Sequence, residues 1–314
     1  MTAFTIAIPS KGRLKDSAER WLVDCGFKLS QRGGERGYQA DLRGLPGAQV
    51  MLLPAREIAQ GLIDGVLHLG ISGEDLLEDL SPQRTADVAV LKRLGFGRAD
   101  VVVAVPQAWL DVNTMADLDA AGALFRSRHG RRFRVATKYH ALTRRYFSRH
   151  AVSEYRLVDS AGATEAAPSA GSADLIVDIT STGATLAANH LKVLSDGVML
   201  RSEAVLGASF RADWSEDAKT ILAVLLDAVD ARDRADALVQ ITAGGPIPDT
   251  VAQENALSFV RGAVAYCPAS KANTIARALT TAGLAPVSVA EVAFIYDGHN
   301  HALESFLDKT MATC

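Results

Sequence analysis

The sequence predicts an α/β protein followed by a smaller α+β module. Short apolar segments typical of buried strands alternate with helical segments over most of the chain, and this pattern changes near residue 213. Residues 49–72 run from strand to helix to strand, which is typical of a βαβ unit with parallel strands. The 314 residues are enough for two to three domains.

The spacing of apolar residues predicts the elements of the first part in turn. The expected strands cover residues 4–9, 49–54, 67–72, 99–106, 132–138, 155–160 and 173–179. The expected helices cover residues 14–26, 55–65 and 141–151. The segment 99–106, ADVVVAVP, is almost wholly apolar, as expected for a strand buried on both faces. A turn over 93–100 separates two series of strands, and we therefore expect two lobes.

One long amphipathic helix is predicted over 215–236, where apolar residues recur at helical spacing and Ser215 can cap the first turn. The strands expected after it cover 237–243, 262–267 and 287–296, with a helix over 270–283. These elements form an α+β module that we expect to be a separate domain.

The composition is that of an ordinary soluble globular protein. Charged residues make up 22% and hydrophobic residues 48%, and a net charge of −3 gives no basic excess that would indicate nucleic acid binding. Cys25, Cys267 and Cys314 are far apart in the sequence, so free thiols in a reducing compartment fit better than a zinc site. The apolar run at the N-terminus is too short for a signal peptide, and we expect a cytoplasmic protein without a membrane span.

A strand that ends in an acid and several small hydroxyl residues lies at 174–191, DLIVDITSTGATLAANHL. The following helix would direct backbone N–H groups at an anion, and Gly183 permits the backbone of an anion-binding nest. Asp178 suits sugar hydroxyls, because a carboxylate accepts two hydrogen bonds. The predicted ribose 5-phosphate site comprises Asp178, Thr180, Ser181, Thr182, Gly183, Ala184 and Thr185. The alternative is an ordinary turn capped by Thr182 or Thr185.

Basic side chains follow strand ends at three further places. Lys11 and Arg13 open a helix after the first strand, where they suit a polyphosphate or form a solvated basic turn. Arg56 lies just past another strand end. Lys138 and Arg144 are expected to lie near one another across a strand-to-helix junction, where an anion contact and a solvent-facing helix are both open.

Acids and glycines mark two more loops. The segment GISGED ends a strand at the edge where open α/β sheets bind ligands. Its candidate residues are Gly70, Gly73, Glu74 and Asp75. The two acids could equally be first-turn residues that complement a helix dipole. Glu165 lies in a small-residue loop upstream of the phosphate candidate.

In this order, the segments resemble the ATP phosphoribosyltransferases, the enzymes that open histidine biosynthesis. The first matching motifs are P-x-K-G-R-L at 9–14, an arginine ahead of a helix at position 56, G-x-x-D-L-G-I-x-G-x-D at 65–75 and L-x-F-G at 94–97. The others are A-T-K-Y at 136–139, G-x-x-E-x-A-P at 162–168 and D-[IL]-x-S-T-G-x-T-L-x-x-N-x-L at 178–191. The last is the most specific, and it is intact. His68 departs from the family, which has aspartate before L-G-I. The resemblance covers roughly residues 4–210.

The resemblance implies a two-lobed, periplasmic-binding-protein-like catalytic core and a reaction. N1 of the adenine of ATP displaces pyrophosphate from C1 of phosphoribosyl pyrophosphate (PRPP), with Mg²⁺. It implies that Lys11, Arg13 and Arg56 neutralise the phosphates as catalytic cations, and that the 178–185 loop and Glu165 bind PRPP. The resemblance places Gly70, Gly73, Glu74 and Asp75 near the nucleotide, and we assign the possible anion contacts Lys138 and Arg144 to ATP as well.

The family also suggests a division of the chain. Residues 1–95 with 191–213 would form one catalytic lobe, 96–190 the second lobe, and 214–314 a C-terminal domain. Long-form members end in a ferredoxin-like regulatory domain through which histidine inhibits the enzyme. Short-form members instead depend on a separate subunit related to histidyl-tRNA synthetase. Both possibilities stay open for this sequence, and we expect a homo-oligomer.

Two other functions compete with this interpretation. A two-lobed ligand sensor without catalysis would share the architecture, because fold does not determine function. A phosphoribosyltransferase for another base is also compatible, since the choice of adenine rests on the shape of the pocket.

Overall fold

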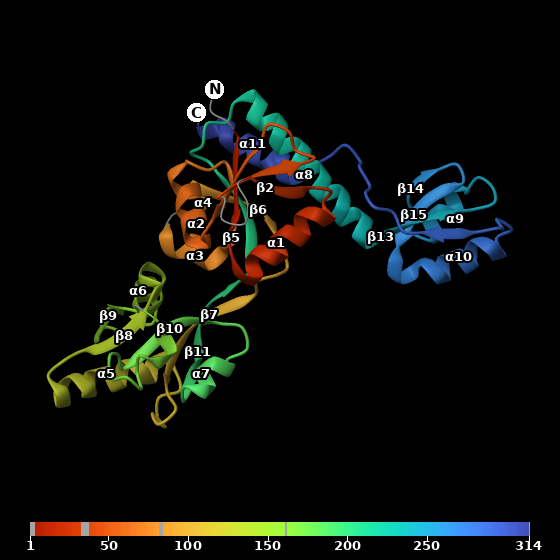
Figure 1. Cartoon of the computed structure of the whole chain (residues 1–314). Helices are drawn as coiled ribbons and strands as arrows, with labels where there is room; N and C mark the ends of the chain where they lie inside the picture. Colours follow the sequence, from red (N-terminus) through yellow and green to blue (C-terminus); the bar gives the residue numbers. More distant parts are fainter. Residues whose placement is uncertain (1–3, 33–37, 82–83, 161, 314) are drawn as a thin grey trace. The chain divides into compact units, whose positions relative to one another are not determined.

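A seven-stranded sheet lies in the first part of the chain (Figure 1). The computed structural model describes residues 4–32, 38–81, 84–160 and 162–313. The strand order of this sheet is β2-β3-β4-β1-β5-β12-β6. Its strands are β1 (Thr5–Pro9), β2 (Lys28–Arg32), β3 (Gln39–Arg43), β4 (Gln49–Leu53), β5 (Leu69–Gly73), β6 (Val88–Arg93) and β12 (Ala204–Ser209). Its helices are α1 (Gly12–Asp24), α2 (Ala55–Asp64), α3 (Glu74–Leu80) and α4 (Arg84–Asp87).

The parallel βαβ unit predicted at 49–72 is present. Both β4 and β5 run parallel to β1, which lies between them, and α2 makes the crossover. The apolar face of α2 buries Ile58, Ala59 and Leu62 against the sheet. A Cβ at Gly70 would lie 2.4 Å from Cγ2 of Ile58, so the glycine is what lets α2 approach β5 this closely.

A five-stranded sheet carries the second series of strands in the order β11-β7-β10-β8-β9. Its strands are β7 (Ala99–Pro106), β8 (Phe133–Thr137), β9 (Tyr155–Asp159), β10 (Leu175–Thr180) and β11 (Leu191–Ser202). Its helical segments are α5 (Met115–His129), α6 (His140–Arg149), η1 (Thr164–Ala166) and α7 (Ala184–Ala188). β8, β9 and β10 are parallel, whereas β7 is antiparallel to its neighbours β10 and β11. The apolar strand 99–106 is confirmed as β7, and its residues Val101 to Val105 are at most 2% exposed.

A four-stranded antiparallel sheet forms the last part of the chain, in the order β14-β15-β13-β16. Its strands are β13 (Leu238–Thr242), β14 (Ser258–Arg261), β15 (Val264–Pro268) and β16 (Ser288–Ala290). Its helical segments are α9 (Asp249–Glu254), η2 (Ala269–Lys271) and α10 (Ala272–Thr281). The chain order is β-α-β-β-α-β, which is that of the ferredoxin-like fold.

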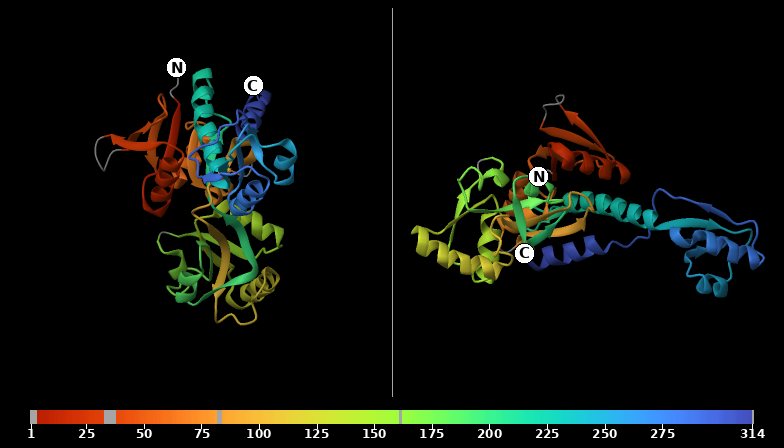
Figure 2. Two further views of the ribbon diagram at one scale, coloured as in Figure 1. Left: turned by 90° about the vertical axis from the view of Figure 1, so that its right-hand side faces the viewer. Right: turned by 90° about the horizontal axis from the view of Figure 1, so that it is seen from below.

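The long helix predicted at 215–236 is α8 (Glu216–Ala237), which runs without a break in both views (Figure 2). The C-terminal helix α11 (His301–Thr313) packs along it. The strand expected over 287–296 is confirmed only for Ser288–Ala290, whose three residues are all exposed. Only part of this run therefore pairs with the sheet.

The described chain separates into two units, which we treat individually. The first comprises Met1–Arg20, Leu29–Leu42 and Gly47–Ser215, and the second comprises Trp21–Lys28, Arg43–Pro46 and Glu216–Cys314. Our three-part division of the chain stays a prediction. Within the segment 191–213, β11 pairs with β7 of the second sheet, whereas β12 pairs with β5 of the first.

His68, the departure from the family motif, is a buried residue of the first unit. Its ring packs against Phe4 and Trp214, with ring centroids 5.2 and 5.1 Å away. The amide of Thr5 donates to Nδ1 at 3.2 Å, so the ring proton lies on Nε2 and is donated to the carbonyl of Asp213 at 2.9 Å.

Cys25 and Cys267 are buried and form no disulfide among the described residues, as predicted, and Cys314 lies outside the described residues. Within the described part of the chain, no helix has both the length and the apolar character needed to cross a membrane.

We predict that Gly70→Ala lowers the free energy of unfolding by about 1–3 kcal/mol, because the new methyl group overpacks the contact between β5 and α2. Urea unfolding followed by circular dichroism measures this change. Gly162→Ala is the control, since a Cβ there meets nothing within 4 Å and the residue has no left-handed backbone. Equal stability of the two variants would contradict the packing argument.

Candidate functional site

The candidate phosphate loop begins where β10 ends and continues into α7. Gly183 caps α7 with φ 75° and ψ −5°, a left-handed conformation that favours glycine. The hydroxyl of Thr180 accepts from the Gly183 amide at 2.9 Å, and the hydroxyl of Thr182 accepts from Ala184 at 3.4 Å. Ser181, Thr182 and the first residues of α7 are exposed. The loop therefore presents hydroxyls and main-chain amides to solvent on a defined backbone.

Asp178 lies in the same neighbourhood as two other candidate residues, Glu165 and Lys138. Burial raises the pKa of Asp178, and the negative charge of Glu165 raises it further. The Ile179 amide, which donates to Asp178 at 2.8 Å, and the positive charge of Lys138 act in the opposite direction. The pairing of β10 with β8 explains the grouping, because Val177 is level with Thr137. The next residues of the two parallel strands are Asp178 and Lys138.

Glu74 and Asp75 are both 4% exposed at the start of α3, and both have partners. The guanidinium of Arg93 donates to the two carboxylate oxygens of Glu74 at 2.5 and 2.6 Å. The Asp75 carboxylate accepts from the hydroxyls of Tyr139, at 2.7 Å, and Ser202, at 2.8 Å. These acids shape the loop after β5 through internal bonds.

Gly73 is the residue that permits this arrangement of Asp75. A Cβ at Gly73 would lie 2.3 Å from Oδ1 of Asp75, so any side chain there would displace the carboxylate. Gly70 lies under α2, as described above. Gly70 thus permits the close contact of β5 with α2, and Gly73 permits the position of the Asp75 carboxylate.

Tyr139 connects α3 to the strand ends of the second sheet. It is 6% exposed, and burial raises the pKa of its hydroxyl, with the negative charge of Asp75 adding to the effect. The charges of Asp178 and Asp79 act in the same direction. Tyr139 therefore stays protonated and donates its hydrogen bond to Asp75.

The candidate cations have different surroundings. Lys11 and Arg13 are exposed around the start of α1, and their side chains bond to no described residue. Arg56, with 49% of its side chain exposed, bonds to Asp79 at 3.3 Å. Lys138 donates to the carbonyl of Gly162 at 3.3 Å.

Arg144 is set apart from Lys138. It is exposed on α6, and its charge lowers the pKa of Tyr155 against the effect of burial. Tyr155 starts β9 and is level with Phe133, the first residue of β8, whereas Lys138 follows the other end of β8. The structure thus groups Lys138 with Asp178 and leaves Arg144 outside that group.

Four residues of this region were missed by the sequence reasoning: Asp79, Arg93, Tyr139 and Ser202. Tyr139 lies in the A-T-K-Y motif, which was a usable signal. Asp79 also carried a weak signal, as an acid one helical turn after Asp75. Arg93 and Ser202 reach the acids only through the pairing of β5, β12 and β6.

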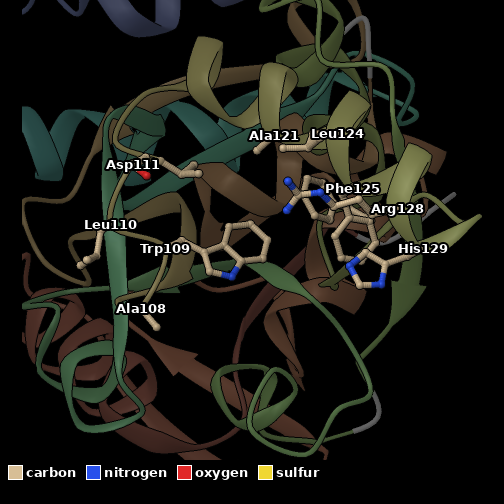
Figure 3. A pocket seen from close by; sticks show the side chains of 11 residues that line it. Ala108, Trp109, Leu110, Asp111, Ala121, Leu124, Phe125, Arg128 and His129 are labelled. Carbon is tan, nitrogen blue, oxygen red and sulfur yellow. The ribbon is translucent and has the colours of Figure 1, made fainter.

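A separate pocket of about 540 Å³ lies elsewhere in the second sheet (Figure 3). Trp109, Phe125, Arg128 and His129 line it together with Phe133. Phe133 begins β8 and Trp109 follows the end of β7, which is antiparallel to β10. The pocket therefore lies beyond the amino ends of β8 and β10, whereas Asp178 lies toward the carboxyl end of β10. It is not part of the candidate site.

Asp174, which immediately precedes β10, and Asp178, which lies within it, provide a matched pH test. Asp178→Asn should raise the thermal midpoint at pH 7. Burial disfavours the charged carboxylate in the folded protein and raises its pKa, and a neutral amide avoids this cost. The folded protein then binds more protons than the unfolded chain above about pH 3.9, so stability falls as pH rises there. The gain should vanish below about pH 3.9, where both states are protonated.

Asp174→Asn is the control with the opposite sign. Burial alone would raise the pKa of Asp174, but its bonds with Arg131 and Arg134 hold it at about 2. The charged carboxylate stabilises the folded protein at pH values above the pKa of an aspartate in the unfolded chain. This stabilisation is lost as the pH falls toward about 2. The variant should lower the midpoint at pH 7, and shifts of the same sign for both variants would refute the assignment.

Comparisons with known proteins give one family. A family model described as ATP phosphoribosyltransferase matches residues 54–229. The ATP phosphoribosyltransferase of Caulobacter vibrioides (strain NA1000 / CB15N) is 49% identical over 313 residues, covering 98% of each chain. That of Rhodopseudomonas palustris (strain BisB18) is 46% identical over 321 residues, covering 98% of this chain and 99% of the relative.

Among solved structures, the fold is similar to the ATP phosphoribosyl transferase (HisG:HisZ) complex from Thermotoga maritima. The TM-score is 0.55 at 22% identity, and the match covers 72% of this chain and 96% of the other. This likeness supports the fold alone.

Proposed function

The chain belongs to the ATP phosphoribosyltransferase family, and from this membership we propose how its residues carry out the reaction. The enzyme transfers the 5-phosphoribosyl group of PRPP to N1 of ATP. The products are N1-(5-phosphoribosyl)-ATP and pyrophosphate, in the first step of L-histidine biosynthesis. A ligand sensor and a transferase for another base are not favoured by this membership.

The 5-phosphate of PRPP binds the loop from Thr180 to Thr185, and Asp178 and Glu165 bind the ribose hydroxyls. The observation that carries this proposal is the grouping of Asp178, Glu165 and Lys138 beside the left-handed turn at Gly183. Small residues let a phosphate approach the amides, and the two carboxylates provide acceptors for a diol. Burial raises the pKa of Asp178, so its charged form costs stability, and such perturbed groups cluster at functional sites.

The chemistry needs positioning more than a protein nucleophile. Adenine N1 is itself nucleophilic, and the sugar reacts through a state with positive charge near C1, so the main task is to align two polyanions and stabilise the leaving diphosphate. Lys11, Arg13 and Arg56 perform this second task. The lack of partners for Lys11 and Arg13 among the described residues supports the proposal, since both are available to an anion.

The residues that we propose for ATP binding divide into two groups. Lys138 and Arg144 are cations that can contact phosphates. Gly70, Gly73, Glu74 and Asp75 contribute through the shape of the loop after β5, because their contacts lie within the protein.

Mg²⁺ is the proposed cofactor, held mainly by diphosphate oxygens and water. Asp178 and Glu165 fit this arrangement, because Mg²⁺ usually takes one or two carboxylates together with substrate phosphates. When bound, the ion neutralises charge on the leaving group. Asp178, Glu165 and the basic side chains then keep the ribose and diphosphate oriented.

Residues 214–314 form a regulatory domain that binds histidine, and the protein is a cytoplasmic homo-oligomer. The ferredoxin-like strand order supports the regulatory role, since the long-form members of the family end in such a domain. A separate regulatory subunit is the alternative, and the Thermotoga maritima structure is a complex of two kinds of chain, HisG and HisZ, in that organism.

We predict that Gly183→Val abolishes PRPP binding, because a β-branched residue cannot hold the left-handed turn without strain. Isothermal titration calorimetry with PRPP measures the loss, and pyrophosphate release in the presence of ATP measures the reaction. Gly171→Val is the matched control, since Gly171 has φ 70° and also meets nothing within 4 Å. PRPP binding that survives in Gly183→Val, or is lost equally in both variants, would contradict the loop assignment.

The purified chain should make pyrophosphate from ATP and PRPP without a second protein, and histidine should inhibit it. A steady-state assay with and without histidine tests both statements. Activity that appears only after a partner protein is added would favour the regulatory-subunit alternative. Activity without inhibition would remove the histidine-binding role from residues 214–314.

A further inference from the structure

A buried carboxylate lies next to Arg56, one of the proposed cations. Asp79, in the last turn of α3, is 4% exposed. Its Oδ2 accepts from Nη2 of Arg56 at 3.3 Å. Its Oδ1 accepts from the amides of Ala141 and Leu142 at 3.0 and 3.1 Å. Each oxygen of this carboxylate therefore accepts hydrogen bonds from a different segment of the chain.

The two segments belong to different sheets. Arg56 opens α2 directly after β4 of the first sheet. Ala141 and Leu142 are in the first turn of α6, which follows β8 of the second sheet and begins two residues after Lys138. The Asp79 carboxylate thus connects Arg56, which we propose stabilises the leaving diphosphate, to the segment that carries Lys138.

Neighbouring acids of α3 reinforce the same contact. Asp75 accepts from Tyr139, just before α6, and the main-chain carbonyl of Glu78 accepts from Arg145 within α6. With Asp79, three acidic residues of α3 bond to α6 or its approach. The start of α6 is consequently held, and the Asp79 side chain has little freedom to leave Arg56.

Apart from Asp79, solvent surrounds much of the Arg56 side chain. About half of it is exposed, and a long guanidinium side chain loses considerable rotamer entropy when it is ordered. Asp79 is the acid with which it forms an ion pair in the described chain. A cation that must meet a leaving diphosphate gains from being oriented before the reaction.

We propose that Asp79 is a positioning residue for the reaction: it orients the Arg56 guanidinium and fixes the start of α6. This inference rests on the proposed role of Arg56 toward pyrophosphate. It adds a residue that does not touch substrate and acts through the arginine.

Asp79→Asn separates the two tasks of the carboxylate. The amide oxygen of asparagine can still accept from the amides of Ala141 and Leu142, while its NH₂ group cannot accept from Arg56. We expect kcat to fall about tenfold, which corresponds to about 1.4 kcal/mol. KM for ATP should stay within about twofold, and the circular dichroism spectrum should be unchanged.

A double-mutant cycle distinguishes positioning from a structural role. In an Arg56→Ala background, Asp79→Asn should lower kcat by less than about twofold, because there is no guanidinium left to orient. Glu78→Gln is the matched control on the same helix, where Glu78 pairs with Arg84 and Arg145. It should leave kcat close to that of the unchanged protein, and any small effect should be additive with Arg56→Ala.

Each other outcome has one meaning. If Asp79→Asn lowers kcat equally with and without Arg56, or has no effect, the positioning role is refuted. If Arg56→Ala retains full kcat, the proposed function of Arg56 itself fails. If Asp79→Asn does not fold, Asp79→Ser takes its place in the cycle, since the space left by its shorter side chain can hold a water that accepts from the α6 amides.

Discussion

Buried carboxylates that must be compensated are the constraint on which this structure depends. Removing a charge from water is costly unless hydrogen bonds or an opposite charge replace the solvent. Glu74, Asp75 and Asp79 are each 4% exposed. Their partners come from β6, β11, the approach to α6 and the first residues of α2 and α6. Compensation of three charges on one short helix therefore determines where several distant segments lie.

The second sheet adds a simpler constraint of register. Parallel strands end at the same edge, so residues that follow level positions become neighbours. Lys138 and Asp178 are brought together in this way by β8 and β10. The loop after β10 is stabilised locally, because the hydroxyls of Thr180 and Thr182 accept hydrogen bonds from the amides of Gly183 and Ala184. The residues proposed to contact substrate thus lie at positions that backbone pairing determines.

The sequence predicted the parts of the fold whose signal is local. The apolar run of β7 and the long amphipathic helix α8 are confirmed, because burial imposes a visible pattern on each. Helix α5 was missed, since its apolar residues do not follow one face, although Thr114 and Asp117 form a capping box that could have indicated it. Among the candidate residues, the strand-end positions of Asp178 and Lys138 could be predicted, but their grouping could not, because Lys138 was expected beside Arg144 and only the pairing of β8 with β10 brings it to Asp178. Ser202 could not, because it is 127 residues from Asp75 and only strand order brings them together.

The imidazole of His68 has a consequence for how this family can diverge. One ring nitrogen accepts a hydrogen bond from the main-chain amide of Thr5, and the other donates one to the main-chain carbonyl of Asp213. An aspartate, the residue that the family motif carries at this position, could accept from the Thr5 amide but has no proton to donate to the Asp213 carbonyl. The hydrogen bond that joins position 68 to the segment before Trp214 would then be lost. Variation at position 68 should follow variation around position 213, even though the two are 145 residues apart.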